Sequence, residues 1–135
     1  MAKEAGFGKI EKLKSRKLVE ELFARGKSLH LFPIRISYKF LPLLDNEKTI
    51  LQVGVSVSKR NFKKAVDRNR IKRLLREAYR LQKQELIQVL KAQGKQGYVF
   101  FIYTDKQIPQ YAIVFDAMTK CLEILKRKAI NENRS

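Results

Sequence analysis

The stretch KRNFKKAVDRNRIKRLLREAYRLQK, residues 59–83, decides how the rest of this 135-residue chain can fold. It carries Lys or Arg at most of its polar positions and an apolar residue every three or four, which is the pattern of a basic amphipathic helix. At about 100° of rotation per residue, one arc carries the apolar residues Ile71, Leu74, Leu75, Ala78 and Leu81. The other arc carries Arg68, Asn69, Lys72, Arg73, Arg76, Arg80 and Lys83. We expect the first arc to pack on a sheet and the second to face a polyanion.

The charges on this helix would repel one another in isolation. Arg68, Lys72, Arg76 and Arg80 follow one another at a spacing of four, and each like-charged pair destabilises a free helix by roughly a few tenths of a kcal/mol. A charge run is often only a solvated face, but here acids are almost absent and Arg outnumbers Lys. Arg offers a planar fork suited to phosphate oxygens and base edges. We therefore interpret this face as a nucleic-acid-binding surface, in which Asn69 can position a nucleotide.

The whole chain is basic, with a formal net charge of +17 and a pI near 10.2. Such a charge indicates a nucleic acid or an anionic membrane as partner without choosing between them. The length fits one domain with a single core. The lone Cys121 excludes an internal disulfide and suits a reducing compartment. No apolar run approaches the ~18 residues of a membrane span, and no signal peptide is evident, so we expect a soluble, cytoplasmic protein without a membrane partner.

Patterns on either side of the basic helix predict further elements. Residues 1–14 resemble a flexible basic arm, and a short helix follows from Ser15, its N-cap, to Gly26, a left-handed stop. Residues 34–40 and 49–57 alternate apolar and polar side chains, as strands do, and their simplest arrangement is as antiparallel neighbours. Residues 98–103 are apolar throughout, which favours a central strand covered on both sides.

The basic helix begins near Lys64 and either continues to the Gly94 stop or breaks near Gln82. A last helix carries an apolar stripe from Tyr111 to Leu125 and ends on basic residues. The order helix, strand, strand, helix, strand, helix predicts an α/β fold of the α+β sandwich kind, with helices packed on a small, mostly antiparallel sheet. We expect a single RNA-binding domain over residues 15–130 and a disordered tail over residues 131–135.

The sequence offers little protein catalytic machinery. His30 is the only histidine, so the usual pairs of base and nucleophile are unavailable, and we expect it at a loop or strand edge. No cluster of Cys and His can hold zinc, and whether any protein group ligates a metal stays open. Asp45 and Glu47 fit solvated turn acids, and Cys121 lies on the apolar stripe of the last helix as inert core. We predict no catalytic residue in the protein and a catalyst located elsewhere.

The segment SVSKRNFKKAVDRNRIKRLLREAYR, residues 56–80, resembles the signature of the bacterial ribonuclease P protein subunit. Its hallmark is Arg68, Asn69 and Arg70 followed by Ile71, Lys72, Arg73, Leu74 and Arg76. The resemblance implies an accessory subunit of a ribonucleoprotein endoribonuclease, whose large catalytic RNA uses Mg²⁺, held mainly by that RNA, to remove the 5′ leader of precursor tRNA. It also implies a left-handed β-α-β crossover that carries the basic helix, and no required protein partner.

Two RNA-binding surfaces follow from the resemblance. The catalytic RNA would contact Arg68, Asn69, Arg70, Lys72, Arg73, Arg76 and Arg80. The single-stranded leader would lie in a cleft that includes Phe23, Tyr38, Lys59, Arg60, Lys72 and Arg76. Phe23 matches a family aromatic that can stack on a base, whereas Val19 stands where a second aromatic is frequent. Tyr38 and Phe40 are stacking candidates for which a core role is an equal alternative.

Four other functions compete with this one. A structural ribosomal protein, or another RNA-chaperone-like RNA-binding protein, would also be small, basic and α/β. A DNA-binding helix-turn-helix would need a short helix just before the basic one. A membrane-surface helix would need Trp or Phe at its polar boundary, where only Tyr79 is expected. An autonomous nuclease lacks the required residues.

Overall fold

The computed structural model describes residues 16–43 and 49–131, and it contains three helices and four strands within these ranges. The helices are α1 (Arg16–Arg25), α2 (Ala65–Ala92) and α3 (Tyr111–Asn131). The strands are β1 (Lys27–Leu31), β2 (Ile34–Pro42), β3 (Leu51–Val57) and β4 (Lys95–Tyr103). The expected arm over 1–14, the Ser15 cap, the acids Asp45 and Glu47 and most of the expected tail lie outside the described residues.

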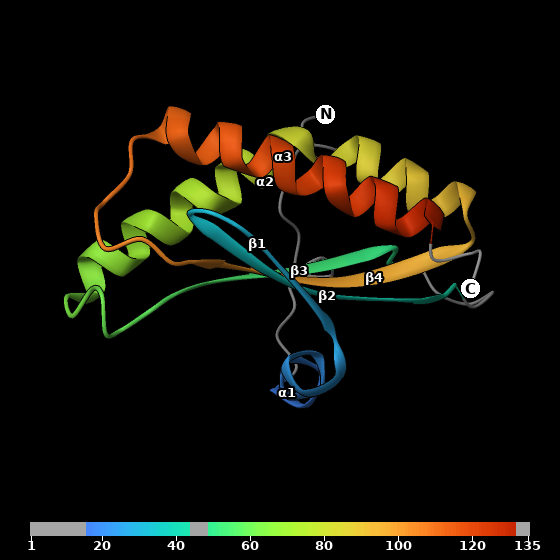
Figure 1. Ribbon diagram of the computed structural model, residues 1–135, viewed down its shortest axis with the longest axis horizontal. Coiled ribbons are helices and arrows are strands. Elements are labelled where there is room, and N and C mark those ends of the chain that lie inside the picture. The colour runs from blue at the N-terminus through green and yellow to red at the C-terminus, as the bar shows by residue number, and fades with distance from the viewer. Residues whose placement is uncertain (1–15, 44–48, 132–135) are drawn as a thin grey trace.

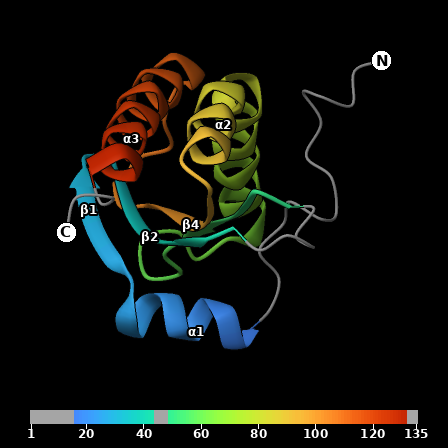
Figure 2. The ribbon, with the colours of Figure 1, turned by 90° about the vertical axis from the view of Figure 1, so that its right-hand side faces the viewer.

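The four strands form one sheet in the order β1-β2-β4-β3. β2 pairs antiparallel with both β1 and β4, whereas β3 pairs parallel with β4, so that β3, α2 and β4 form a β-α-β unit. Helices α2 and α3 lie side by side on one face of the sheet, and α1 lies on the other (Figures 1 and 2). The mixed α+β fold class is therefore confirmed, while the hand of the crossover stays an implication of the resemblance.

The core fills the layer between the sheet and the helices α2 and α3. Strand residues alternate in burial, and the inward set includes Ile36, Val53 and Phe101, each at most 1% exposed. β4 pairs with a strand on each edge, as β2 does, so it is a central strand as predicted. Its second face is covered less completely, because Tyr98, Phe100 and Ile102 stay partly exposed. Cys121 is fully buried in this core, as predicted, and burial raises the pKa of its thiol to about 12.

Two predictions about the sheet are wrong. Strand β1 was not expected, because KSLHL is short, mostly exposed and only weakly alternating, and it is held as an edge strand by pairing with β2. The segments 34–40 and 49–57 are not neighbours, because β4 lies between them. Alternation identifies strands, but it carries no information on which strand pairs with which.

Helix α2 is continuous over 28 residues and does not break near Gln82. Its buried face is rotated relative to the expected one: Tyr79 and Lys83 are buried, whereas Leu81 is 53% exposed. The rotation arises because the helix must face both the sheet and α3, so the buried positions 71, 75, 79, 86 and 90 follow the line between these two partners. Tyr79 is therefore not at a polar boundary, and Lys83 does not belong to the exposed basic face.

The two predicted glycine stops differ in conformation. Gly94, after α2, has a φ of 66°, the left-handed conformation that favours glycine. Gly26, after α1, has no positive φ, so the predicted left-handed stop is wrong there. A Cβ at Gly26 would lie 2.4 Å from the Leu22 carbonyl oxygen. A glycine is therefore required here because the backbone of Leu22 approaches position 26 too closely for a side chain.

Candidate RNA-binding surfaces

The first half of α2 presents a cationic surface to solvent. No glycine or proline interrupts the helix, and Asp67 in its first turn complements the helix dipole. Ile71 and Leu75 anchor it to the core with no exposed surface. On the opposite side the exposed residues Asn69, Arg70, Arg73 and Arg76 line a shallow hollow together with Val66 and Asp67. We refer to Arg68, Asn69, Arg70, Lys72, Arg73, Arg76 and Arg80 as the helix surface.

The seven residues of the helix surface are not equivalent. Arg68 donates hydrogen bonds to the carbonyl oxygens of Phe62 and Lys63, at 2.9 and 2.8 Å, and so holds the chain that enters α2. Arg80 forms an ion pair with Glu77, and this hydrogen bond lowers the pKa of the Glu77 carboxyl. The side chains of Arg70, Arg73 and Arg76 form no hydrogen bond or ion pair with another described residue, so binding a phosphate would break no contact within the described part of the chain.

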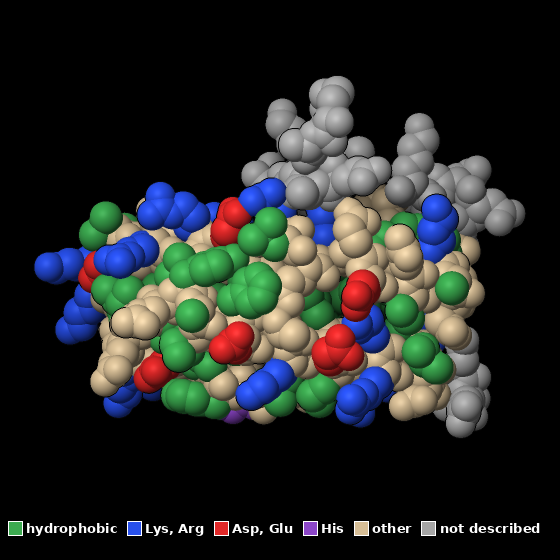
Figure 3. Space-filling view, turned by 90° about the horizontal axis from the view of Figure 1, so that it is seen from above, with side chains coloured by type: hydrophobic (Ala, Val, Ile, Leu, Met, Phe, Trp, Pro, Cys, Tyr) green, Lys and Arg blue, Asp and Glu red, His purple; other side chains and the backbone are tan. Residues whose placement is uncertain are grey.

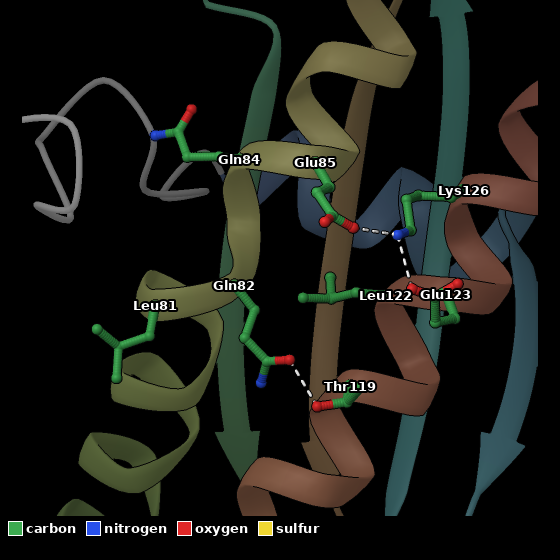
Figure 4. Close-up of a pocket in the computed structure, with 8 residues that line it drawn as sticks. All are labelled: Leu81, Gln82, Gln84, Glu85, Thr119, Leu122, Glu123 and Lys126. Carbon is green, nitrogen blue, oxygen red and sulfur yellow. Dashed lines mark hydrogen bonds and ion pairs between the residues drawn. The ribbon is translucent and has the colours of Figure 1, made fainter.

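The outer face of α2 and α3 has a different character from the helix surface. Figure 3 shows cationic side chains gathered where α2 begins and acidic side chains interspersed over the rest of this face. The hollow between the two helices is bordered by polar contacts among its lining residues (Figure 4). Lys126 bridges Glu85 and Glu123 at 2.5 and 2.7 Å, and its hydrogen bond lowers the pKa of the Glu123 carboxyl. Thr119 Oγ1 donates to Gln82 Oε1 at 2.5 Å.

A second candidate surface lies on the face of the sheet that carries α1. Phe23 of α1 is 49% exposed, and its ring packs edge-to-face on Phe100 of β4 with 5.3 Å between centroids. The strand register places one row of side chains beyond this contact, toward the end of the sheet where β3 and β4 finish. This row, which we call the open row, consists of His30, Arg35, Ile102 and Ser56, all at least partly exposed.

Three loops meet at the end of the open row. Asn61, in the loop from β3 to α2, donates to the carbonyl oxygens of Thr104 and Asp105 at 3.4 and 3.5 Å. The backbone N–H of Thr104 donates to the carbonyl oxygen of Pro33, in the β1–β2 turn, at 2.8 Å. Lys59 and Arg60 are exposed in the first of these loops. The loops therefore form one connected, cationic border of the open row.

The residues predicted to bind the leader are divided by the structure. Phe23, Lys59 and Arg60 border the α1 face, as described above. Tyr38 is 1% exposed, so the core role is the one the structure shows, and we leave it out of the binding surface. Lys72 and Arg76 belong to α2, which packs on the other face, and they can reach the α1 face only past the edge strand β3. Their contact with the leader stays a prediction.

Sequence reasoning missed the open row itself. Arg35 was recognised only as one polar position of an alternating strand, and β1, which supplies His30, was not expected. His30 does lie on an edge strand, as predicted. The row could have been found by listing the residues of each strand that point away from the core and then aligning the strands in their order in the sheet. The sequence supplies the first of these but not the strand order.

The described residues contain no group of three or more His, Cys, Asp or Glu side chains placed to hold a metal ion. None of the helices in the described ranges has the length and apolar character that a membrane span requires. This part of the chain displays exposed cations and aromatic rings, which are suited to contact with a polyanion.

The fold and these two surfaces define a small, basic α+β protein suited to bind RNA. The family model described as Ribonuclease P matches residues 7–129, and the chain belongs to this family. It is 35% identical over 117 residues to the ribonuclease P protein component of Porphyromonas gingivalis strain ATCC 33277, a match that covers 87% of this chain and 84% of that protein. A 79-residue match to the component of Chlorobium phaeobacteroides is 42% identical and covers 58% of this chain and 54% of that protein.

Solved structures of the same family share the fold. The ribonuclease P protein from Thermotoga maritima aligns with a TM-score of 0.63 at 24% identity, covering 87% of this chain and 96% of that one. The protein from Staphylococcus aureus aligns with a TM-score of 0.64 at 18% identity, covering 84% and 94%. At these identities the likeness supports the fold alone.

Proposed function

We propose that this chain is the protein subunit of ribonuclease P and that its two cationic surfaces hold two different RNAs. As a member of this family it is the accessory subunit of a ribonucleoprotein endoribonuclease, in which the RNA carries out catalysis and the 5′ leader of precursor tRNA is removed. Its partners are ribonuclease P RNA and precursor tRNA. We also infer a cytoplasmic location, because bacteria make tRNA precursors there.

The helix surface is proposed to bind the catalytic RNA. The observation that carries this assignment is that Arg70, Arg73 and Arg76 are exposed on one side of α2. The other side of the helix is buried in the core. Planar guanidinium groups on a rigid helix bind phosphates at little entropic cost, because the backbone is already ordered. Arg68 and Arg80 contribute charge while they keep their contacts with Phe62, Lys63 and Glu77.

The α1 face is proposed to bind the single-stranded leader. Phe23 offers a half-exposed ring that Phe100 supports from the side, and Lys59 and Arg60 supply charge at the border of the open row. Single strands are held by such combinations of aromatic stacking and a basic groove. Arg35, in the middle of the open row, adds a cation that can contact a leader phosphate.

Ribonuclease P is a metal-dependent enzyme, and we propose Mg²⁺ as the metal, held mainly by the RNA. Mg²⁺ usually keeps several waters and binds phosphate oxygens, whereas the side chains named here are cations and aromatic rings that contact RNA. With a net charge of +17, the protein screens the repulsion between the catalytic RNA and the precursor. Productive docking then requires less Mg²⁺ than the RNA alone would need.

The test is cleavage of a precursor tRNA by a bacterial ribonuclease P RNA at low Mg²⁺, with and without the purified chain. We expect strong stimulation by the chain, loss of stimulation with Arg73→Glu, and retention with the matched reversal Lys120→Glu on the exposed side of α3. Tight, salt-sensitive RNA binding without stimulation of any bacterial ribonuclease P RNA would refute the proposal and favour a ribosomal or chaperone-like role.

A further inference from the structure

Phe32, in the turn between β1 and β2, exposes 68% of its surface although it is a large aromatic residue. It does not belong to the buried core. An exposed aromatic side chain is ordinary where it is isolated on a surface. Phe32 differs because its ring contacts His30 and because it lies at the β1 end of the open row, which carries the exposed Arg35.

Contacts among three elements support the turn that carries Phe32 and one side of its ring. Thr104 Oγ1 donates to the carbonyl oxygen of Pro33 at 3.1 Å, and the Thr104 N–H donates to the same oxygen. Because the hydroxyl proton is used in this way, His30 Nε2 acts as donor to Thr104 Oγ1 across 3.1 Å. The His30 ring in turn packs edge-to-face against Phe32, with 6.2 Å between centroids. The aromatic ring is thus pre-organised, which lowers the entropy lost on binding.

The contact with His30 also shows on which face of the sheet Phe32 lies. His30 pairs with Arg35, and Arg35 pairs with Ile102, so all three side chains project from the face that carries α1. The open row crosses four strands, a width of about 14 Å at the usual spacing between strands. Phe32 lies at the β1 end of this row, while Lys59 and Arg60 lie beyond its β3 end.

Charge around the row favours a polyanion over an apolar partner. The β1–β2 turn, the β3–α2 loop and the β4–α3 loop together contain five cations and one acid among their described residues. The cations are Lys59, Arg60, Lys63, Lys64 and Lys106, and the acid is Asp105. Arg35 adds a further exposed cation inside the row. An exposed aromatic ring with cations beside it is the combination that single-stranded nucleic acids use for stacking.

We propose that Phe32, supported by His30, is a second stacking platform for a base of the precursor leader, separate from Phe23. This inference rests on the proposed function, since it names a further contact of the same RNA. The leader would cross the open row with its phosphates near Arg35 and would present one base to each aromatic ring.

The first experiment measures the affinity of the assembled holoenzyme for precursor tRNA and for mature tRNA. We expect Phe32→Ala to weaken precursor binding about five-fold or more and to leave mature tRNA binding unchanged. Leu81→Ala is the matched control, because Leu81 is also an exposed apolar residue, at 53%, but lies by the hollow between α2 and α3. Equal effects of the two substitutions would overturn the proposal.

Two further comparisons separate this inference from the proposed function. If Phe23→Ala abolishes the preference for precursor over mature tRNA and Phe32→Ala does not, the platform is refuted and the leader surface stands. If the wild-type holoenzyme shows no such preference, both are refuted. A series of shortened leaders then identifies the nucleotide, because the effect of Phe32→Ala must vanish once that nucleotide is removed.

A direct measurement uses the absence of tryptophan from the sequence. Phe32→Trp introduces a single tryptophan, which can be excited apart from the five tyrosines and whose emission changes when a base stacks on it. We expect a change when precursor tRNA is added to the holoenzyme, and none with mature tRNA or with Leu81→Trp as the reporter. A change already produced by the catalytic RNA alone would overturn the assignment to the leader.

Discussion

Replacing Gly54 by alanine should displace the ring on which Phe23 rests. A Cβ at position 54 would lie 2.2 Å from Cε1 and 2.5 Å from Cδ1 of Phe100. Carbon atoms in contact are normally ~3.5–4.0 Å apart, so the ring must move by roughly 1.3 Å or more. Overpacking of this kind costs about 1–3 kcal/mol, which includes weakening of the edge-to-face pair of Phe100 with Phe23. We expect the free energy of unfolding to fall by ~1–3 kcal/mol.

A double-mutant cycle measured by urea unfolding tests the origin of this effect. In a Phe100→Ala background the clash is absent, and Gly54→Ala should be neutral or stabilise by about 0.4–1 kcal/mol, because alanine restricts the unfolded chain. The sign of the Gly54→Ala effect should therefore change between the two backgrounds. An equal loss of stability in both would show that Phe100 is not the reason for a glycine at this position.

The same variant links packing to RNA binding. With Phe100 displaced, Phe23 loses its lateral support, so Gly54→Ala should reduce the preference of the holoenzyme for precursor over mature tRNA. Binding to the catalytic RNA should be unchanged, because the helix surface lies on the other side of the sheet. Loss of both kinds of binding would contradict the separation of the two surfaces.

Further predictions concern the helix surface and the core. Arg73→Glu should flatten the plot of log affinity for the catalytic RNA against log salt concentration by about one unit of slope, while Lys120→Glu should leave the slope unchanged. Arg68→Ala should lower the free energy of unfolding by roughly 1–2 kcal/mol, since two carbonyl oxygens lose their donor, and Arg73→Ala should not, as urea unfolding would show. The Cys121 thiol, whose pKa burial raises to about 12, should resist thiol reagents at pH 8 until the chain unfolds. Because the unfolded thiol ionises near its usual value of 9.0, stability should fall as the pH rises above this value, and Cys121→Ala should reduce this dependence.

The sequence predicts local structure here better than it predicts strand pairing. The apolar spacing in α2 predicts one anchored face, and the continuous apolar run of β4 predicts its central place, because both are properties of a single segment. The adjacency of β2 and β4 could not be predicted, because it depends on contacts between segments about 60 residues apart. β1 was missed because its side chains are mostly exposed and its pairing with β2 is what makes it a strand.

For the binding residues too, properties of a single segment could be predicted, whereas contacts between segments could not. Exposure of Arg73 and Arg76 follows from helical geometry and was predictable, whereas Arg70 lies outside the predicted polar arc and was identified only through the resemblance. The burial of Tyr38 was only half predictable: alternation placed it on the apolar face of β2 with Ile34 and Ile36, but a tyrosine on that face can be covered by a helix or offer its ring to a ligand. The role of Arg68 in holding Phe62 and Lys63 was also hidden, because a motif shows which residue types are present and not which backbone groups they contact.

The central place of β4 constrains the order in which the nascent chain can fold. The β1–β2 hairpin is local and can form as soon as it leaves the ribosome, but β3 has no partner in the sheet until residues 95–103 have been synthesised. Until then α2 exposes both an apolar face and a line of mutually repelling cations. Non-local pairing of this kind slows folding. The sheet can therefore be completed only after β4 has been synthesised. An RNA that neutralises the cations of α2 during this interval would favour the native arrangement.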